Sequence, residues 1–130
     1  MEMKAVQAEP RRLPDAELAV MQALWDCDIP AERSALEGRL RDSHPMAPTT
    51  LLTLLGRLAE KGFVKIEKAG RGSVYTPLVS ERDYVAAQSR RFYTKLCGGS
   101  MSAFAAALCD GGLSREELAE LRRLLEENAL

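Results

Sequence analysis

The sequence predicts a mainly α-helical fold with one small β-hairpin, organised in two parts at residues 1–78 and 79–130. Two observations carry this prediction. Three segments with the apolar spacing of helices precede a pair of short alternating strands, and serine–acid pairs then mark the starts of further helices. With 130 residues, the chain has the length of one ordinary domain, or of a small domain with a helical extension.

The first two helices are predicted from apolar residues that recur at three- and four-residue intervals. Over about residues 15–26 the inward positions are Leu18, Val20, Met21, Leu24 and Trp25. A shorter helix is predicted over about 31–41, with Ala35, Leu36 and Leu40 turned inward. Turn-forming residues at 42–45 separate it from the next helix.

The third helix, at about residues 48–61, has two faces of different composition. The buried side is predicted to consist of leucines, namely Leu51, Leu52, Leu54, Leu55 and Leu58. The opposite side carries hydroxyls, one glycine and two charged groups, in Thr49, Thr50, Thr53, Gly56, Arg57 and Glu60. Pro48 lies in the first turn, where proline is tolerated, and Gly62 follows the last turn. This polar face is the candidate binding surface.

A β-hairpin is predicted directly after this helix, over about residues 63–77. Residues 63–68 alternate like a half-buried strand, and residues 73–76 return as its partner before Pro77. The turn consists of Ala69, Gly70, Arg71 and Gly72, because glycine adopts the positive φ that a tight reversal needs. The hairpin therefore carries Arg71 at its tip and Lys68 beside it.

Three more helices are predicted in residues 79–130. Ser80 with Asp83 and Ser114 with Glu117 match the pairing that caps a helix, which places helices at about 81–97 and 115–127. A short helix is predicted at 101–109, with Met101, Phe104, Ala105 and Leu108 buried.

The apolar faces of these three helices are too extensive for about 50 residues to bury alone, so a homodimer is predicted. The expected dimer contacts are Val85, Phe92, Leu96, Phe104, Leu108, Leu118, Leu121 and Leu125. The alternative is that these faces pack against residues 1–78 of the same chain.

Charge is distributed unevenly along the chain, although the formal net charge is -1. Residues 1–32 carry three basic and seven acidic side chains, whereas residues 33–78 carry eight basic and four acidic ones. Residues 79–130 are nearly balanced, with seven basic and eight acidic side chains. Such a local positive excess indicates a polyanionic partner.

The composition argues against several classes of protein. No apolar run approaches the roughly 18–20 residues that cross a membrane, and residues 1–14 lack the apolar core of a secretory signal, so a cytoplasmic protein is predicted. The single histidine, His44, has no catalytic or metal-ligand spacing around it, so no enzyme, cofactor or metal site is predicted. Cys27, Cys97 and Cys109 are predicted to be reduced and buried.

Three helices followed by a basic hairpin are the layout of a winged helix-turn-helix, in which the third helix enters the DNA major groove. The predicted DNA contacts are Thr49, Thr50, Thr53 and Arg57 on that helix, and Lys68 and Arg71 on the wing. Thr50 and Thr53 would contact phosphate or a thymine methyl, and Arg57 would contact phosphate or a guanine edge. The sequence therefore predicts a protein that binds double-stranded DNA.

Residues 49–80 resemble the penicillinase-repressor family of the BlaI/MecI type, which has the copper-responsive CopY repressors as relatives. The family pattern T-V-x-T-x-L-x-R-L-x-x-K-G, followed by a G-R-x-x-x-Y-x-P wing, is matched by Thr50, Thr53, Leu55, Arg57, Leu58, Lys61, Gly62, Gly70, Arg71, Tyr75 and Pro77. Leu51 takes the place of the family's valine. Glu17, Val20, Met21 and Trp25 resemble the family's opening pattern, and residues 92–99 resemble its F-x-x-x-L-x-G-G element.

This resemblance implies a homodimeric transcriptional repressor that binds a palindromic operator, with the C-terminal helices as the dimer interface. It also implies a membrane-anchored sensor and protease system that releases the repressor by cleavage at an Asn-Phe bond. Ala107 and Leu108 stand at the corresponding place, which argues against that cleavage. The copper-responsive relatives use C-terminal CxC motifs, whereas residues 110–130 contain no cysteine.

Two alternatives stay open at this point. One is a winged-helix module that binds protein, for which a steep salt dependence of binding is not expected. The other is a thiol-responsive regulator in which Cys97 and Cys109 flank the glycine break and the short helix.

Overall fold

The computed structural model describes residues 10–128 and divides the chain into two compact units. The first unit ends at Gln88 and the second begins at Ser89. Most of residues 1–14, in which no export signal is predicted, lie outside the described range. The functional division between residues 78 and 79 stays a prediction.

Three helices and a three-stranded antiparallel sheet make up most of the first unit. The helices are α2 (Asp15–Trp25), α3 (Arg33–Ser43) and α4 (Pro48–Glu60). The strands are β1 (Ala31–Glu32), β2 (Val64–Ala69) and β3 (Gly72–Pro77), in the order β1-β3-β2. The mainly α-helical fold with a hairpin after the third helix is therefore confirmed.

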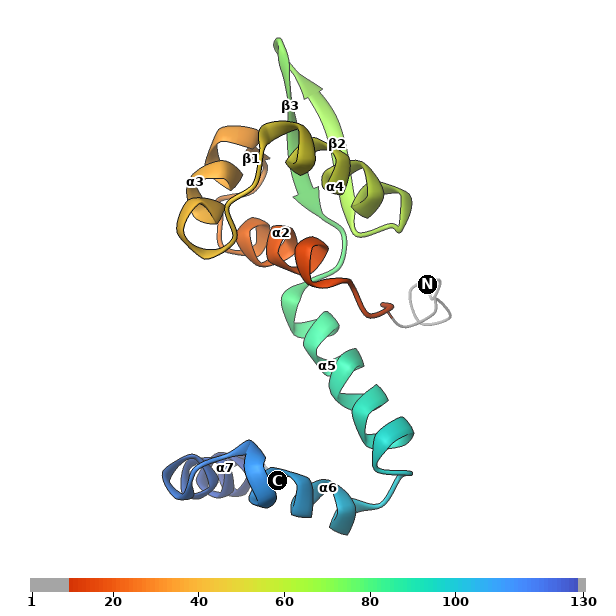
Figure 1. Cartoon of the computed structure of the whole chain (residues 1–130), viewed down its shortest axis with the longest axis vertical. Helices are drawn as coiled ribbons and strands as arrows, with labels where there is room; N and C mark the ends of the chain where they lie inside the picture. Colours follow the sequence, from red (N-terminus) through yellow and green to blue (C-terminus); the bar gives the residue numbers. More distant parts are fainter. Residues whose placement is uncertain (1–9, 129–130) are drawn as a thin grey trace. The chain divides into compact units, whose positions relative to one another are not determined.

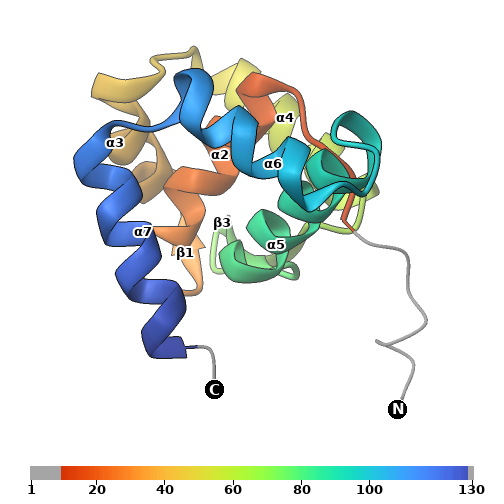
Figure 2. The same cartoon turned by 90° about the horizontal axis from the view of Figure 1, so that it is seen from below.

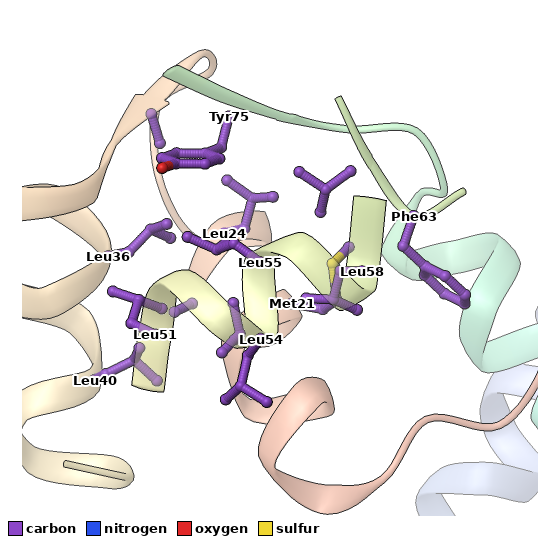
Figure 3. Packing of buried hydrophobic residues seen from close by; sticks show 14 of the residues in the cluster. Met21, Leu24, Leu36, Leu40, Leu51, Leu54, Leu55, Leu58, Phe63 and Tyr75 are labelled. Atoms are coloured by element: carbon purple, nitrogen blue, oxygen red, sulfur yellow. The ribbon is translucent and has the colours of Figure 1, made fainter. Parts of the chain in front are cut away.

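The core of this unit lies where the apolar faces of the three helices meet the sheet (Figure 3). Its buried side chains include Met21, Leu24, Leu36, Leu40, Leu51, Leu54, Leu55, Leu58, Phe63 and Tyr75. The helical spacing that predicted these helices also selects their buried faces, because only one side of a helix can face the core. The core thus holds α4 by one side and leaves its other side in solvent.

The first strand, β1, is a feature that sequence analysis did not predict. Residues 31–41 were expected to be helical, but Ala31 and Glu32 pair with Tyr75 and Val74 of β3. A strand of two residues is too short to show alternation, and its pairing partner is distant in the sequence. Ala35, which was expected to turn inward, is exposed, because α3 buries Leu36 and Leu40 instead.

A buried ion pair joins α2 to the end of α4. Glu17 is only 4% exposed, and the Lys61 Nζ lies 2.6 Å from its Oε1. A carboxylate in such surroundings is stable only when it is paired. This pair holds the C-terminal end of α4 against α2, and the Glu17 carboxylate neutralises the charge of Lys61.

The first turns of α5 (Glu81–Arg91) also contribute to the first unit. The buried Tyr84 ring lies 5.8 Å from the Trp25 ring and 5.9 Å from the Phe63 ring, measured between centroids. Its hydroxyl accepts a hydrogen bond of 2.9 Å from the backbone N–H of Leu13. Tyr84 therefore ties the start of α5 to α2, to the residue that opens the wing and to the segment before α2.

The second unit continues with η1 (Phe92–Leu96), α6 (Met101–Ala107), η2 (Leu108–Gly112) and α7 (Arg115–Asn128). Figure 2 shows that α6 and α7 meet at an angle where η2 joins them. Both predicted capping pairs are confirmed. The Asp83 N–H donates to the Ser80 Oγ, the Glu117 N–H donates to the Ser114 Oγ, and the Ser114 N–H donates to the Glu117 Oε1.

The helix expected over 81–97 is shorter than predicted, because α5 ends at Arg91 and a π-helical turn, η1, follows. The Thr94 hydroxyl donates to the carbonyl oxygen of Arg90 at 3.0 Å. A hydroxyl that bonds the preceding turn in this way bends a helix and disturbs its backbone ladder. The chain then reverses at Gly98 and Gly99, where the Tyr93 hydroxyl donates to the Gly99 carbonyl.

Burial in the second unit is lower than the sequence suggested. Met101 and Ala105 were expected to be buried but are exposed, and Phe104 and Leu108 are only half-buried. The cysteine prediction is also wrong in part, because Cys109 is exposed and Cys27 and Cys97 are half-buried. All three thiols are free, as predicted. Within the described range, no side chain from η1 to α7 is fully buried.

Candidate nucleic-acid interface

The outer face of α4 is the first part of the candidate interface. Thr49, Thr50, Thr53 and Arg57 are all exposed, because the leucines on the opposite face hold the helix against the core. Pro48 occupies the first turn, and no side chain caps the N-terminus of this helix. The positive end of the helix dipole therefore stays available to an anion.

Two side chains on this face differ from expectation. Leu52 was assigned to the buried side but is 43% exposed, because α4 is covered only along Leu51, Leu54, Leu55 and Leu58. The Thr53 hydroxyl donates its proton to the Thr49 carbonyl at 3.0 Å. Its oxygen can still accept a hydrogen bond, but the hydroxyl is not available to donate to phosphate.

The hairpin of β2 and β3 forms the second part. Its strands pair from Val64 with Pro77 to Ala69 with Gly72, so the turn consists of Gly70 and Arg71. Gly70 has a φ of 62°, which glycine adopts without strain. Lys68 and Arg71 are both exposed, so the structure places the two predicted wing cations at the end of a projecting ribbon (Figure 1).

Ion pairing separates the basic residues of 33–78 into two groups. Four of them neutralise neighbouring carboxylates, in the pairs Arg33–Glu37, Arg39–Asp26, Lys61–Glu17 and Lys65–Glu67. Within the part of the chain that the structure describes, the other four form no ion pair, and these are Arg41, Arg57, Lys68 and Arg71. Within residues 33–78, the unpaired positive charge therefore lies on α4, the wing and the end of α3.

Arg41 is the residue that sequence analysis did not single out. It is exposed near the end of α3 and, with Pro48 and Leu51, lines a cavity of about 190 Å³ at the turn before α4. It therefore lies close to the first turn of α4, where Thr49 and Thr50 are exposed. The only sequence signal was its membership of the basic middle segment.

A second candidate surface lies on the C-terminal helices. Four of the eight predicted dimer contacts are exposed, namely Val85, Phe92, Leu96 and Leu125. Their exposed fractions range from 37% for Phe92 to 76% for Leu96. The other four, Phe104, Leu108, Leu118 and Leu121, are half-buried. The rings of Phe92 and Tyr93 both pack against Phe104, with centroids 5.7 and 5.8 Å apart. The predicted residues are thus accessible or partly accessible in the single chain.

No group of three or more His, Cys, Asp or Glu side chains is placed to hold a metal ion in residues 10–128. No helix in this range is long and apolar enough to cross a membrane.

The comparison with known proteins agrees with this layout. The sequence model of the family described as penicillinase repressor matches residues 13–127. The chain is also 32% identical over 118 residues to the penicillinase repressor of Bacillus licheniformis, which covers 90% of this chain and 91% of the relative. The chain belongs to the penicillinase repressor family.

Further relatives of this penicillinase repressor family member include the methicillin resistance regulatory protein MecI of Mammaliicoccus sciuri. It is 28% identical over 116 residues, which cover 88% of this chain and 94% of MecI. Among solved structures, the DNA binding domain of the repressor BlaI matches with a TM-score of 0.50 and 34% identity, over 61% of this chain and 94% of that domain. The winged helix-turn-helix fold is therefore confirmed.

Proposed function

We propose that this chain is a transcriptional repressor that binds a palindromic DNA operator as a homodimer, with α4 in the major groove and the wing on the backbone. The observation that carries the proposal is the set of exposed, unpaired cations on the end of α3, on α4 and on the wing, namely Arg41, Arg57, Lys68 and Arg71. DNA affinity depends mainly on such charges, because each one that neutralises a phosphate releases counterions.

Each part of the interface has a separate task in this proposal. Arg41 and the open N-terminus of α4 contact phosphates and fix the register of the helix. Thr53 accepts from a base amino group, and Arg57 donates to a phosphate or to the O6 and N7 atoms of a guanine. Lys68 and Arg71 follow the neighbouring backbone with the wing. The names of the relatives support the more general proposal of DNA binding, since they describe repressors and a DNA binding domain.

The second unit supports a dimer. It comprises about 40 described residues without a fully buried side chain, and chains this short usually need a partner surface to be stable. Its exposed leucines and Phe92 would supply an apolar contact between two copies. Two copies would present their α4 helices to half-sites separated by whole turns of DNA, about 34 Å each.

The steepness of the salt dependence tests the DNA proposal. If Arg41, Arg57, Lys68 and Arg71 of both protomers contact phosphates, log Kd should rise with log salt with a slope of about 7. Fluorescence anisotropy with the DNA sequence enriched by the protein from a random pool measures this slope. A slope near zero, or no enrichment, would favour a winged helix that binds protein.

Arg71→Ala is expected to weaken specific and non-specific DNA binding about equally and to reduce the salt slope by about 1 per protomer, because the wing contacts only phosphate.

Arg57→Ala is expected to weaken the binding free energy by about 1–3 kcal/mol, mostly for the selected sequence if Arg57 reads a guanine. Arg123→Ala in α7 is the charge-matched control, because Arg123 lies outside the proposed DNA interface, on a side of α7 away from the predicted dimer contacts, and is paired with Glu127. Normal affinity in Arg57→Ala and Thr53→Ala would exclude α4 as the reading helix.

Release from DNA is proposed to follow a route other than cleavage between Ala107 and Leu108. These residues differ from the Asn-Phe pair implied by the family resemblance. The bond also lies in helical backbone where α6 passes into η2, with φ and ψ of -62° and -40° at Ala107. A protease would have to open this helix locally before it could cut.

A further inference from the structure

We propose that Leu52 contacts the 5-methyl group of a thymine and so gives the protein a preference for thymine at one position of each half-site. This inference rests on the proposed DNA binding through α4. Leu52 is 43% exposed, and it is the only large apolar side chain of α4 that is exposed. Its exposed neighbours on this helix are Pro48, Thr49 and Thr53, none of which is a large apolar residue.

The position of Leu52, rather than its exposure alone, is the reason for this assignment. Single exposed leucines are common on protein surfaces. Leu52, however, lies one helical turn from Thr49 and next to Thr53, on the face that carries the candidate DNA contacts. A side chain at residue 56 would lie over the turn that contains Leu52, because helical side chains tilt toward the N-terminus. Gly56 has none, and apart from its two chain neighbours and the backbone of its own helix, nothing lies within 4 Å of where its Cβ would be, so this flank of Leu52 is open.

The chemistry of the major groove narrows the partner to thymine. Base edges present hydrogen-bond donors and acceptors there, and the thymine methyl is the apolar group among them. Leucine neither donates nor accepts, so against any other edge it would displace water without replacing its hydrogen bonds. When Leu52 packs against the methyl group, the contact removes about one methyl group's apolar surface from water. This burial corresponds to about a fourfold gain in affinity per half-site.

A protein partner for this side chain is disfavoured by its surroundings. A specific protein interface buries about 800 Å² on each partner and has an apolar centre. On α4 the exposed residues beside Leu52 are Pro48, Thr49 and Thr53, so no extended apolar surface surrounds it on this helix. This face of α4 matches DNA better than it matches an apolar protein contact.

Replacement of thymine by uracil tests the inference, because it removes only the methyl group. The probe is the sequence that the full-length protein enriches from a random DNA pool, with each thymine replaced in turn at both symmetric positions. We expect one position at which the wild-type protein loses about 15-fold in affinity for the two half-sites together. Leu52→Ala and Leu52→Gln should bind more weakly and should show no loss at that position. Circular dichroism melting confirms that both variants fold.

Thr53→Ser is the matched control, because it removes the methyl group of the residue next to Leu52 and keeps the hydroxyl. It should retain the uracil effect. The inference is overturned if the wild-type protein tolerates uracil at every position, if Leu52→Ala keeps the effect, or if Thr53→Ser abolishes it. If the protein tolerates uracil but log Kd still rises steeply with log salt, the thymine contact is excluded and the proposed DNA binding stands. If the protein enriches no DNA, both the thymine contact and the proposed function are overturned.

Discussion

Replacement of Leu121 and Leu125 by glutamate is expected to produce a monomer whose affinity for the palindromic operator is about 10²–10⁴-fold lower. The two leucines share one side of α7 with Leu118, and Leu125 is 60% exposed. Charges placed there would have to be buried in a dimer contact, whereas in a monomer they stay in water. Because α7 buries no side chain within its own chain, the double variant should keep its helices.

The loss in affinity reflects the geometry of two linked half-sites. Once one protomer is bound, the second α4 is held near its own half-site, so its binding is effectively intramolecular. The double variant should therefore bind a single half-site as well as the wild-type protein does. Sedimentation velocity gives the oligomeric state, and anisotropy with full and half operators gives the two affinities.

A charge-matched control separates the dimer effect from simple repulsion by DNA. Ala119→Glu with Arg123→Gln also makes each protomer two units more negative, but on another side of α7. This control should remain a dimer and lose little affinity. A dimeric Leu121→Glu, Leu125→Glu variant would show that α7 lies outside the contact.

Local patterns in the sequence predicted much of the fold. The apolar spacing of α2 and α4, the alternation before Pro77 and the Ser114–Glu117 pair all depend on residues within one or two turns of each other. The features that were missed depend on distant partners. Only the pairing with Tyr75 makes a strand of Ala31 and Glu32. Only the contacts of α4 with its neighbours decide that Leu55 is buried and Leu52 is exposed.

The candidate site shows the same limit. All six predicted DNA-contacting residues are exposed, since a polar face on an amphipathic helix or a charged hairpin tip is a local property. The sequence could not separate Arg41 from Arg39, because only the folded chain brings Asp26 within 2.7 Å of the Arg39 guanidinium. Nor could the sequence show that the Thr53 proton is donated to Thr49, which changes what this hydroxyl can offer to DNA.

Tyr84→Ala is expected to lower the free energy of unfolding of the first unit by about 3–5 kcal/mol, the usual cost of removing a buried aromatic ring. Tyr84 is 5% exposed and packs against both Trp25 and Phe63. Tyr84→Phe should cost less, about 1–3 kcal/mol, because it keeps the ring but leaves the buried N–H of Leu13 without an acceptor. Urea unfolding followed by the fluorescence of Trp25, the single tryptophan of the chain, measures both values.

This prediction also locates the end of the DNA-binding unit. A domain of this size has only about 5–15 kcal/mol of stability, so Tyr84→Ala would leave α4 poorly held and would weaken DNA binding although Tyr84 lies outside the interface. Tyr93→Phe is the control, since its hydroxyl bonds Gly99 at an exposed site in the second unit, and it should change Trp25 unfolding very little. If Tyr84→Ala changed stability by less than about 1 kcal/mol, α5 would contribute nothing to the first unit and the boundary would lie near residue 78. A large loss in the free energy of unfolding would mean that the DNA-binding unit extends through Tyr84. The start of α5 would then be part of the core that supports α4.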